Sequence, residues 1–445
     1  MSSTPTGARP GSRARAYALV AAVCALPRVE VLLHERGAIL GDFEKSYKLA
    51  EMYVKTGTFG YVPGFPSAST QPLYGWFLIP IVWATGLRWW SVGAIQILIA
   101  VGTSLVVFEI GRRFLSLRIG LAAAVIATLQ PYLVWHDVHG NREILDQLLG
   151  AAMFLLALEV ARRKTVVAGA VLGVVAGIAI LSNSRLVLLP VFFSAFLLWR
   201  RIGWVAAAAV PVLAVVALSP WVVRNKLDVG CWQITTDARA LWKANNVNTY
   251  KVLAKGLWID QVIYRQYGGA DIPQRRPPGD LQPVQWMTPT EAGDQYTLNG
   301  RVYDVPECAQ VGPYEHLVFR FWEHHPTEKA KLMGQATEMM WSPQVQSDGS
   351  ANGGGVSGVR RWVEPLYVVP LYLLAIAGLF FVPAAFRALA LIFAFYETAA
   401  AWVFAGTTRY RVPWDFVLAL LAATVLQRLW ARLRSRRARQ PAPAP

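Results

Sequence analysis

Charged residues are scarce in this chain of 445 residues: 16% are Asp, Glu, Lys or Arg, whereas 55% are hydrophobic. Soluble domains usually contain about 25% charged residues. The apolar residues gather in runs of roughly 20, the length that an α-helix needs to cross the hydrocarbon core of a bilayer. The composition therefore excludes a single soluble domain and predicts a polytopic membrane protein.

The sequence also lacks the motifs of several enzyme classes. It contains no Walker motif, no Rossmann fingerprint and no Cys/His spacing of the kind that binds zinc. The glycines at 353–355 and 358 follow no strand and precede no Lys-Ser/Thr pair, so they do not form a phosphate loop. His136, Asp137, His139 and Glu143 cluster in the sequence, but such a cluster is more often a polar helix end than a metal site. Neither a metal nor another cofactor is predicted.

Cysteine is rare, with three residues in the chain. Cys24 lies in the first apolar run, whereas Cys231 and Cys308 lie in a long segment of mixed polarity. The last two form a disulfide only if folding brings them together in an oxidising compartment, and spacing alone leaves that open.

Positive charge is in excess, with 43 Lys and Arg against 27 Asp and Glu. The excess lies in short loops and in the two tails, where it reports membrane topology and does not indicate nucleic acid as a partner. Ten apolar runs are predicted to cross the membrane, at 14–33, 90–110, 117–136, 144–161, 165–182, 186–200, 202–222, 362–383, 385–404 and 412–431.

An eleventh apolar segment, 72–87, is short and contains Pro80. If it does not cross, all the basic clusters fall on one side, as the positive-inside rule requires. We therefore predict a juxtamembrane or re-entrant helix, both termini in the cytoplasm and a multi-pass protein of the cell membrane. Arg13 and Arg15 before the first run also fit a signal peptide, but no clean small-x-small cleavage site follows, which favours a retained span.

The predicted fold class is an all-α polytopic bundle of about ten transmembrane helices, with juxtamembrane helices and a small extracytoplasmic insert of α/β or mixed structure. The insert is too long for a connecting loop, and its helical pattern at 314–340 is interrupted at Pro326. The parts are a cytoplasmic tail (1–13), a membrane catalytic module (14–222) with the first outer loop (34–89), the insert (223–361), C-terminal transmembrane helices (362–431) and a basic cytoplasmic tail (432–445).

Two carboxylates, Asp42 and Glu44, directly follow the first span. Apolar residues recur after them at helical spacing, which predicts an amphipathic helix lying on the membrane surface. Asp42 is well placed to cap that helix. A carboxylate at the mouth of a membrane bundle is otherwise solvated or functional, so Asp42 has both a structural and a catalytic interpretation.

Arginines at the outer ends of several spans favour the catalytic interpretation, because the positive-inside rule gives outer loops little reason to hold them. Snorkelling explains any single one, but together they indicate a bound phosphate, which guanidinium groups grip in a bidentate manner. A sugar on a lipid phosphate needs cations on the leaving group and a base for the incoming hydroxyl, and Asp42 is the candidate base. The outer residues are Arg142 with Glu143, Arg185, Arg224, and Arg409 with Arg411.

In this order the features resemble the GT-C superfamily of polyprenyl-phosphate-dependent glycosyltransferases, in the branch of protein O-mannosyltransferases and the lipid A aminoarabinose transferase. The matching residues are Asp42, Tyr47, Ala50, Gly57, Pro66, Gln71-Pro72-Leu73-Tyr74, Arg142-Glu143, Arg185, Pro220 to Asn225, Leu241-Trp242, Asn245-Asn246 and Arg409-Tyr410-Arg411 with Pro413. The resemblance implies catalysis by the aspartate after the first span, and substrate binding by Tyr74, Glu143 and the outer arginines. It also implies a polyprenyl-phosphate-linked sugar as donor and a glycan, lipid or protein as acceptor.

Two departures and two alternative functions stay open. Phe43 separates Asp42 from Glu44, where relatives often have an adjacent acidic pair, so either carboxylate is a candidate. The chain has no separate C-terminal soluble domain, which suggests that the insert recognises the acceptor. A transporter or flippase is disfavoured because the sequence shows no matching halves and its outer arginines are one-sided. A membrane scaffold would require neither Asp42 nor the charged Arg28 and Glu30 of the first span, which either pair with each other or line the site.

Overall fold

The computed structural model describes most of the chain. The described residues are 10–36, 45–61, 63–259, 262, 295–298, 301–304, 307–345 and 360–437. Asp42 and Glu44 lie outside the described residues, and so do the glycine-rich segment 349–358 and the tail beyond residue 437.

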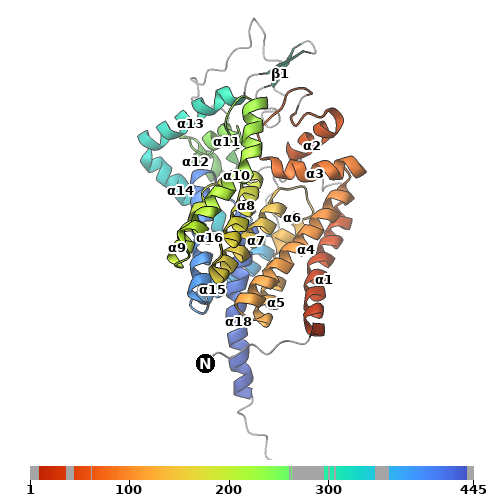
Figure 1. Ribbon diagram of the computed structural model, residues 1–445, viewed down its shortest axis with the longest axis vertical. Helices are drawn as coiled ribbons and strands as arrows, with labels where there is room; N and C mark the ends of the chain where they lie inside the picture. Colours follow the sequence, from red (N-terminus) through yellow and green to blue (C-terminus); the bar gives the residue numbers. More distant parts are fainter. Residues whose placement is uncertain are drawn as a thin grey trace, which may run out of the picture.

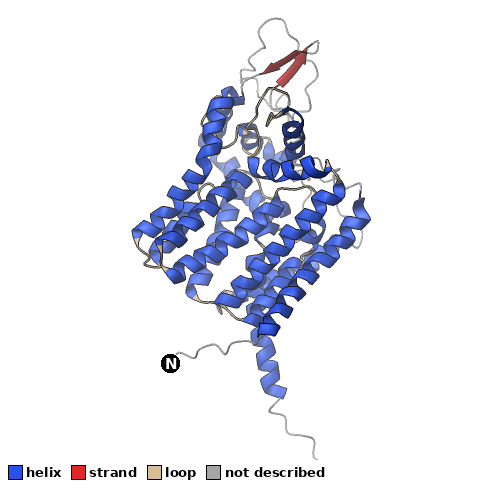
Figure 2. Ribbon diagram, turned by 45° about the vertical axis from the view of Figure 1, so that its right-hand side comes forward, coloured by secondary structure: helices blue, strands red, loops and turns tan. Residues whose placement is uncertain are grey.

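The described part of the chain is almost entirely helical (Figures 1 and 2). Its helices are α1 (Pro10–Glu35), α2 (Lys45–Thr56), α3 (Pro72–Thr85), α4 (Trp89–Phe114), α5 (Leu117–Thr128), α6 (Pro131–His136), α7 (Glu143–Arg163), α8 (Val166–Ser182), η2 (Ser184–Leu186), α9 (Leu189–Trp199), α10 (Trp204–Asp228), α11 (Ala238–Lys243), α12 (Thr249–Ala254), α13 (Glu307–His324), α14 (Pro326–Trp341), α15 (Arg360–Gly378), α16 (Ala384–Val403), α17 (Thr408–Arg411), η5 (Val412–Trp414) and α18 (Phe416–Arg437). Strands β1 (Gln295–Leu298) and β2 (Arg301–Asp304) pair as an antiparallel hairpin.

Helices occupy all ten predicted spans, which confirms the predicted helical membrane fold. Within the described ranges, α1, α4, α7, α10, α16 and α18 are long and apolar enough to cross a membrane by length and composition. Helices α3, α5, α8 and α9 are apolar but shorter.

The predicted span 117–136 is broken, contrary to the expectation of one continuous helix. Helix α5 ends at Thr128 and α6 begins at Pro131, which has no N–H to continue the helical hydrogen bonding. The side chain of Gln130 caps α6 by accepting a hydrogen bond from the backbone N–H of Leu133 at 2.7 Å. The break therefore ends this span in a short helix that leads toward the start of α7.

One end of the bundle, called the tail end here, carries the start of α1 and the end of α18 (Figure 1). The basic turns after α4 and α7 meet there, since Arg113 forms an ion pair with Glu159 at 3.1 Å. Ser116 donates a hydrogen bond at 2.8 Å to Gln427 of α18. These clusters therefore share one side, as predicted. Helix α3 lies across the opposite end beside α2 (Figure 1), an arrangement that fits the predicted juxtamembrane or re-entrant helix.

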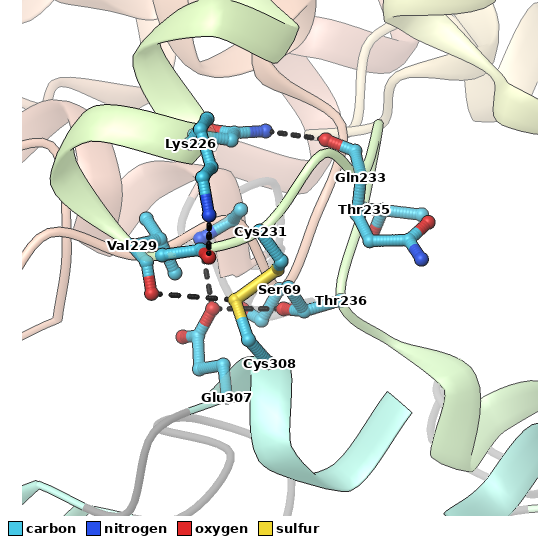
Figure 3. The surroundings of a disulfide bond; sticks show 12 residues. Ser69, Lys226, Val229, Cys231, Gln233, Thr235, Thr236, Glu307 and Cys308 are labelled. Atoms are coloured by element: carbon cyan, nitrogen blue, oxygen red, sulfur yellow. Dashed lines mark hydrogen bonds between the residues drawn. A yellow bond between two sulfur atoms is a disulfide. The ribbon is translucent and has the colours of Figure 1, made fainter. Parts of the chain in front are cut away.

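The opposite end, the insert end, carries α2, α3, the hairpin and α11 to α14 (Figure 1). The predicted interruption of the helical pattern at Pro326 is confirmed, because α13 ends and α14 begins there. Cys231 and Cys308 are joined by a disulfide, with their Cα atoms 5.7 Å apart (Figure 3). This bond ties the segment after α10 to the first turn of α13 and answers the pairing question that the sequence left open.

Candidate active site at the insert end

Four of the predicted site residues form one group at the insert end, called the arginine cluster here: Arg142, Glu143, Arg185 and Arg409. Arg409 donates two hydrogen bonds to the two carboxylate oxygens of Glu143, at 2.8 and 2.9 Å. The Nε atom of Arg142 lies 3.6 Å from the same carboxylate. Glu143 begins α7 and has a side chain only 1% exposed, so it fixes both guanidinium groups from below the surface.

Gln71 of the first outer loop bridges two parts of this site. Its side-chain carbonyl accepts a hydrogen bond from Arg142 at 2.5 Å, and its NH₂ group donates to Ser184 Oγ at 2.8 Å. Gln71 precedes α3, whose first residue is Pro72. The loop therefore connects the start of α7 to the 3₁₀ turn η2, which carries Arg185.

Arg185 is the member of the cluster without an ion pair among the described residues. Its guanidinium group lies over the ring of Tyr410 at 3.7 Å and near the ring of Phe404 at 5.2 Å. One backbone carbonyl, that of Ala405, accepts a hydrogen bond from it at 3.4 Å. Glu397 and Glu143 interact with this guanidinium group electrostatically, but no carboxylate of the described residues lies within ion-pair distance of it. Guanidinium has five N–H donors, so the position is suited to an anion.

The backbone around Arg185 is set by Asp146, one turn into α7. Asp146 accepts hydrogen bonds from Ser182 Oγ at 2.7 Å and from the side chain of Asn183 at 3.0 Å. The side-chain oxygen Oδ1 of Asn183 in turn accepts a hydrogen bond from the backbone N–H of Arg185 at 3.2 Å. Asp146 of α7 therefore holds the end of α8 and the turn that carries Arg185.

Arg224 lies apart from the arginine cluster. It donates hydrogen bonds to the carbonyl oxygens of Ser67 at 2.9 Å and Phe59 at 3.1 Å, and it pairs with Asp228 at 3.1 Å. It lines a groove of about 690 Å³ together with aromatic residues that include Trp221. Its contacts hold the first outer loop against α10.

Arg411 and Tyr74 are buried in separate polar networks. Arg411 is 1% exposed and lies 3.3 Å from Asp415 and 3.4 Å from Glu364, so two carboxylates face its charge. Tyr74 is also 1% exposed and donates a hydrogen bond to Gln96 at 2.7 Å. The network of Arg411 therefore lies within the bundle, whereas that of Tyr74 joins α3 to α4.

The two predicted catalytic carboxylates, Asp42 and Glu44, lie outside the described residues. The helix that follows them, α2, packs against the turn that carries Arg142. Tyr47 of α2 is fully buried and packs on Gly140, two residues before Arg142. A Cβ atom at Gly140 would lie 1.6 Å from the Tyr47 hydroxyl, so only glycine allows this contact. The start of α2 is therefore anchored to the turn that carries Arg142.

The polar side chains at the helix end after α6 contact residues of α1. Arg28 of α1 pairs with Asp137 at 2.7 Å and not with Glu30, which is exposed. His139 lies 2.8 Å from Glu35. No group of three or more His, Cys, Asp or Glu side chains in the described ranges is arranged to hold a metal ion.

Part of the chain matches a known protein family. Residues 68–223 match the family model described as dolichyl-phosphate-mannose-protein mannosyltransferase. The matched range begins within the first outer loop and includes Gln71, Arg142, Glu143 and Arg185, whereas Arg409 lies beyond it. No curated protein matches the sequence.

Solved structures extend the likeness over the whole chain. Archaeal oligosaccharyltransferase AglB from Archaeoglobus fulgidus, in complex with an inhibitory peptide and a dolichol-phosphate, is similar with a TM-score of 0.51 and 13% identity. The similarity covers 96% of this chain and 52% of that one, so the chain spans about half the length of AglB. ArnT from Cupriavidus metallidurans bound to undecaprenyl phosphate gives a TM-score of 0.38 at 13% identity, over 98% of this chain and 82% of that one.

The fold of the chain is similar to that of AglB, and residues 68–223 resemble a family of mannosyltransferases. The predicted resemblance is thereby confirmed. Sequence reasoning missed the parts of this candidate site that are neutral or buried, namely Gln71, Ser184, Asp146 and Asn183. The only signal for Gln71 was its place before Pro72 in the segment that carried the resemblance.

Proposed function

We propose that this protein is a membrane glycosyltransferase that moves a sugar from a polyprenyl-phosphate donor to a hydroxyl group on a glycan, lipid or protein at the extracytoplasmic face. The observation that carries the proposal is Arg185, an arginine without an ion pair among the described residues beside two further guanidinium groups. The family match at residues 68–223 supports the transferase class, and the dolichol-phosphate in the AglB complex supports a lipid phosphate as ligand.

The charges of the cluster suit a phosphate leaving group. Glu143 offsets the charge of Arg409 through its bidentate pair, while Arg185 retains spare N–H donors. When the bond between the anomeric carbon and the phosphate oxygen breaks, its electron pair goes to the phosphate, and negative charge builds there. Arg185 and Arg142 would stabilise that charge in the transition state.

The remaining chemical requirement is a base for the acceptor. The acceptor oxygen forms the new bond to the anomeric carbon, and its proton moves to a carboxylate. We assign this role to Asp42, with Glu44 as the alternative, because both directly precede α2 and α2 is anchored beside Arg142 through Tyr47.

The other residues that the sequence suggested for substrate binding have supporting roles in this proposal. Arg224 holds the first outer loop, Arg411 stabilises the interior of the bundle, and Tyr74 joins α3 to α4. The proposed phosphate clamp therefore consists of Arg142, Arg185 and Arg409, with Glu143 orienting the last. The Cys231–Cys308 disulfide supports an oxidising, extracytoplasmic environment for this end of the protein.

The clamp is tested by binding of undecaprenyl phosphate to the purified protein. Arg185→Ala should weaken binding at least tenfold, and Arg185→Lys should be intermediate, because lysine keeps the charge but loses the planar fork. Arg320→Ala is the matched control, since Arg320 is an exposed arginine of α13. Unchanged affinity in Arg185→Ala would exclude the clamp. Mass spectrometry of envelope glycolipids and glycoproteins with and without the gene then identifies the sugar and the acceptor.

A further inference from the structure

A buried carboxylate of the insert binds the first outer loop. Glu307, in the first turn of α13, is 8% exposed and accepts hydrogen bonds from the hydroxyl of Ser67 and from the backbone N–H of Ala68, the latter at 2.9 Å. The hydroxyl of Thr236 donates to the same carboxylate at 2.8 Å (Figure 3). Three donors thus converge on one side chain, which a carboxylate with two oxygens can satisfy.

The loop segment that Glu307 binds is short and is held at both ends; residues 67–71 are called the strap here. At its first end, Arg224 donates to the carbonyl of Ser67, and the N–H of Thr236 donates at 2.9 Å to the carbonyl of Ala68. At its other end, Gln71 contacts Arg142 and Ser184. Two residues separate Ala68 from Gln71, so the strap links the Glu307 contact directly to the arginine cluster.

The disulfide fixes the position of Glu307. Cys308 directly follows Glu307, and its partner Cys231 lies shortly before Thr236, which contacts the same carboxylate (Figure 3). The carboxylate and one of its donors are therefore held by a common covalent link. The N-terminal position in α13 also suits a negative charge, because the helix dipole is positive there.

We infer that Glu307 is a positioning residue for the arginine cluster: through the strap it sets Gln71, and Gln71 sets Arg142 against Ser184 and Arg185. This inference rests on the proposed function, since it assigns the strap to the phosphate site. It gives the insert a part in donor binding, in addition to the acceptor recognition expected from the sequence.

The test combines amide hydrogen exchange with binding of undecaprenyl phosphate to the full chain. Glu307→Ala should speed exchange at least tenfold in peptides covering 67–74, speed it in peptides covering 139–147, and weaken lipid-phosphate binding about tenfold. Glu307→Gln keeps one acceptor oxygen and should recover part of both effects. Glu323→Ala is the control, because Glu323 lies on the same helix with its side chain 80% exposed.

The outcomes separate the inference from the proposed function. Faster exchange in both regions with weaker binding supports the positioning role. Unchanged exchange, or faster exchange with unchanged affinity, overturns it and leaves the proposed function standing. If the parent protein binds no undecaprenyl phosphate, the proposed function fails, and exchange at 139–147 alone decides whether Glu307 sets Arg142. Should Glu307→Ala fail to fold, Ser67→Ala removes one of its contacts and should give a smaller effect of the same kind.

Discussion

Replacing Glu143 with Gln should destabilise the free protein yet increase its stabilisation by lipid phosphate. Glu143 is 1% exposed and binds Arg409 through both carboxylate oxygens, so the substitution leaves the guanidinium group of Arg409 without its counter-charge. Removing one partner of a buried ion pair costs about 3–5 kcal/mol. The side chain of Arg409 is 17% exposed, which places the expected loss near the lower value, about 3 kcal/mol.

A bound phosphate would replace the missing charge. Its affinity for Glu143→Gln should therefore exceed its affinity for the parent protein, and a tenfold lower Kd adds about 1.4 kcal/mol of stabilisation at a given saturating concentration. The assay is thermal unfolding of the purified protein with and without a fixed concentration of undecaprenyl phosphate. The Tm of Glu143→Gln should be lower without the lipid, and its increase on adding the lipid should be larger.

The exposed Glu323 provides the matched control, since Glu323→Gln makes the same chemical change outside the cluster and should alter neither value. If undecaprenyl phosphate raises the Tm of Glu143→Gln by no more than that of the parent protein, the phosphate does not bind where Glu143 holds Arg409. The proposed clamp would then be wrong.

Three further predictions concern packing, pH and topology. Gly140→Ala should lower stability by about 1–3 kcal/mol in thermal unfolding, because its Cβ would collide with buried Tyr47, whereas Gly102→Ala, with nothing within 4 Å, should not. Burial lowers the pKa of Lys329 from 10.5 to about 8, so the unfolded chain binds more protons between these values and stability should rise with pH there; equal pH dependence in Lys329→Met would contradict this. A topology reporter fused after Arg113 should be cytoplasmic, and an extracytoplasmic signal would overturn the assignment of the tail end.

Hydrophobic runs and charge were sufficient to predict the helical membrane fold. The positive-inside rule predicts that α3 does not cross, because a crossing at 72–87 would move the later arginines to the other side. The break in the third span was visible in Pro131 but was missed, because apolar length alone does not reveal that Gln130 caps a second helix.

The positive-inside rule also predicted which arginines lie at the outer ends of the spans, but it did not predict which groups they contact. An arginine on an outer loop is expected to bind a partner there, but its position does not show whether that partner is a phosphate, a carboxylate or a backbone carbonyl. Arg411 faces two carboxylates and Arg224 binds backbone carbonyls. The bridge from Gln71 to Ser184 joins residues 113 positions apart, a contact that only tertiary structure specifies.

The contact between Ser67 and Glu307 has a consequence for biosynthesis, because 240 residues separate the two partners in the sequence. Chains grow at about 5–20 residues per second, so Glu307 is synthesised on the order of tens of seconds after the strap. During that time most of the membrane helices have already been inserted. Under the proposed function, newly made molecules would therefore enter the membrane before Glu307 holds the strap, and folding of the insert would complete the arginine cluster.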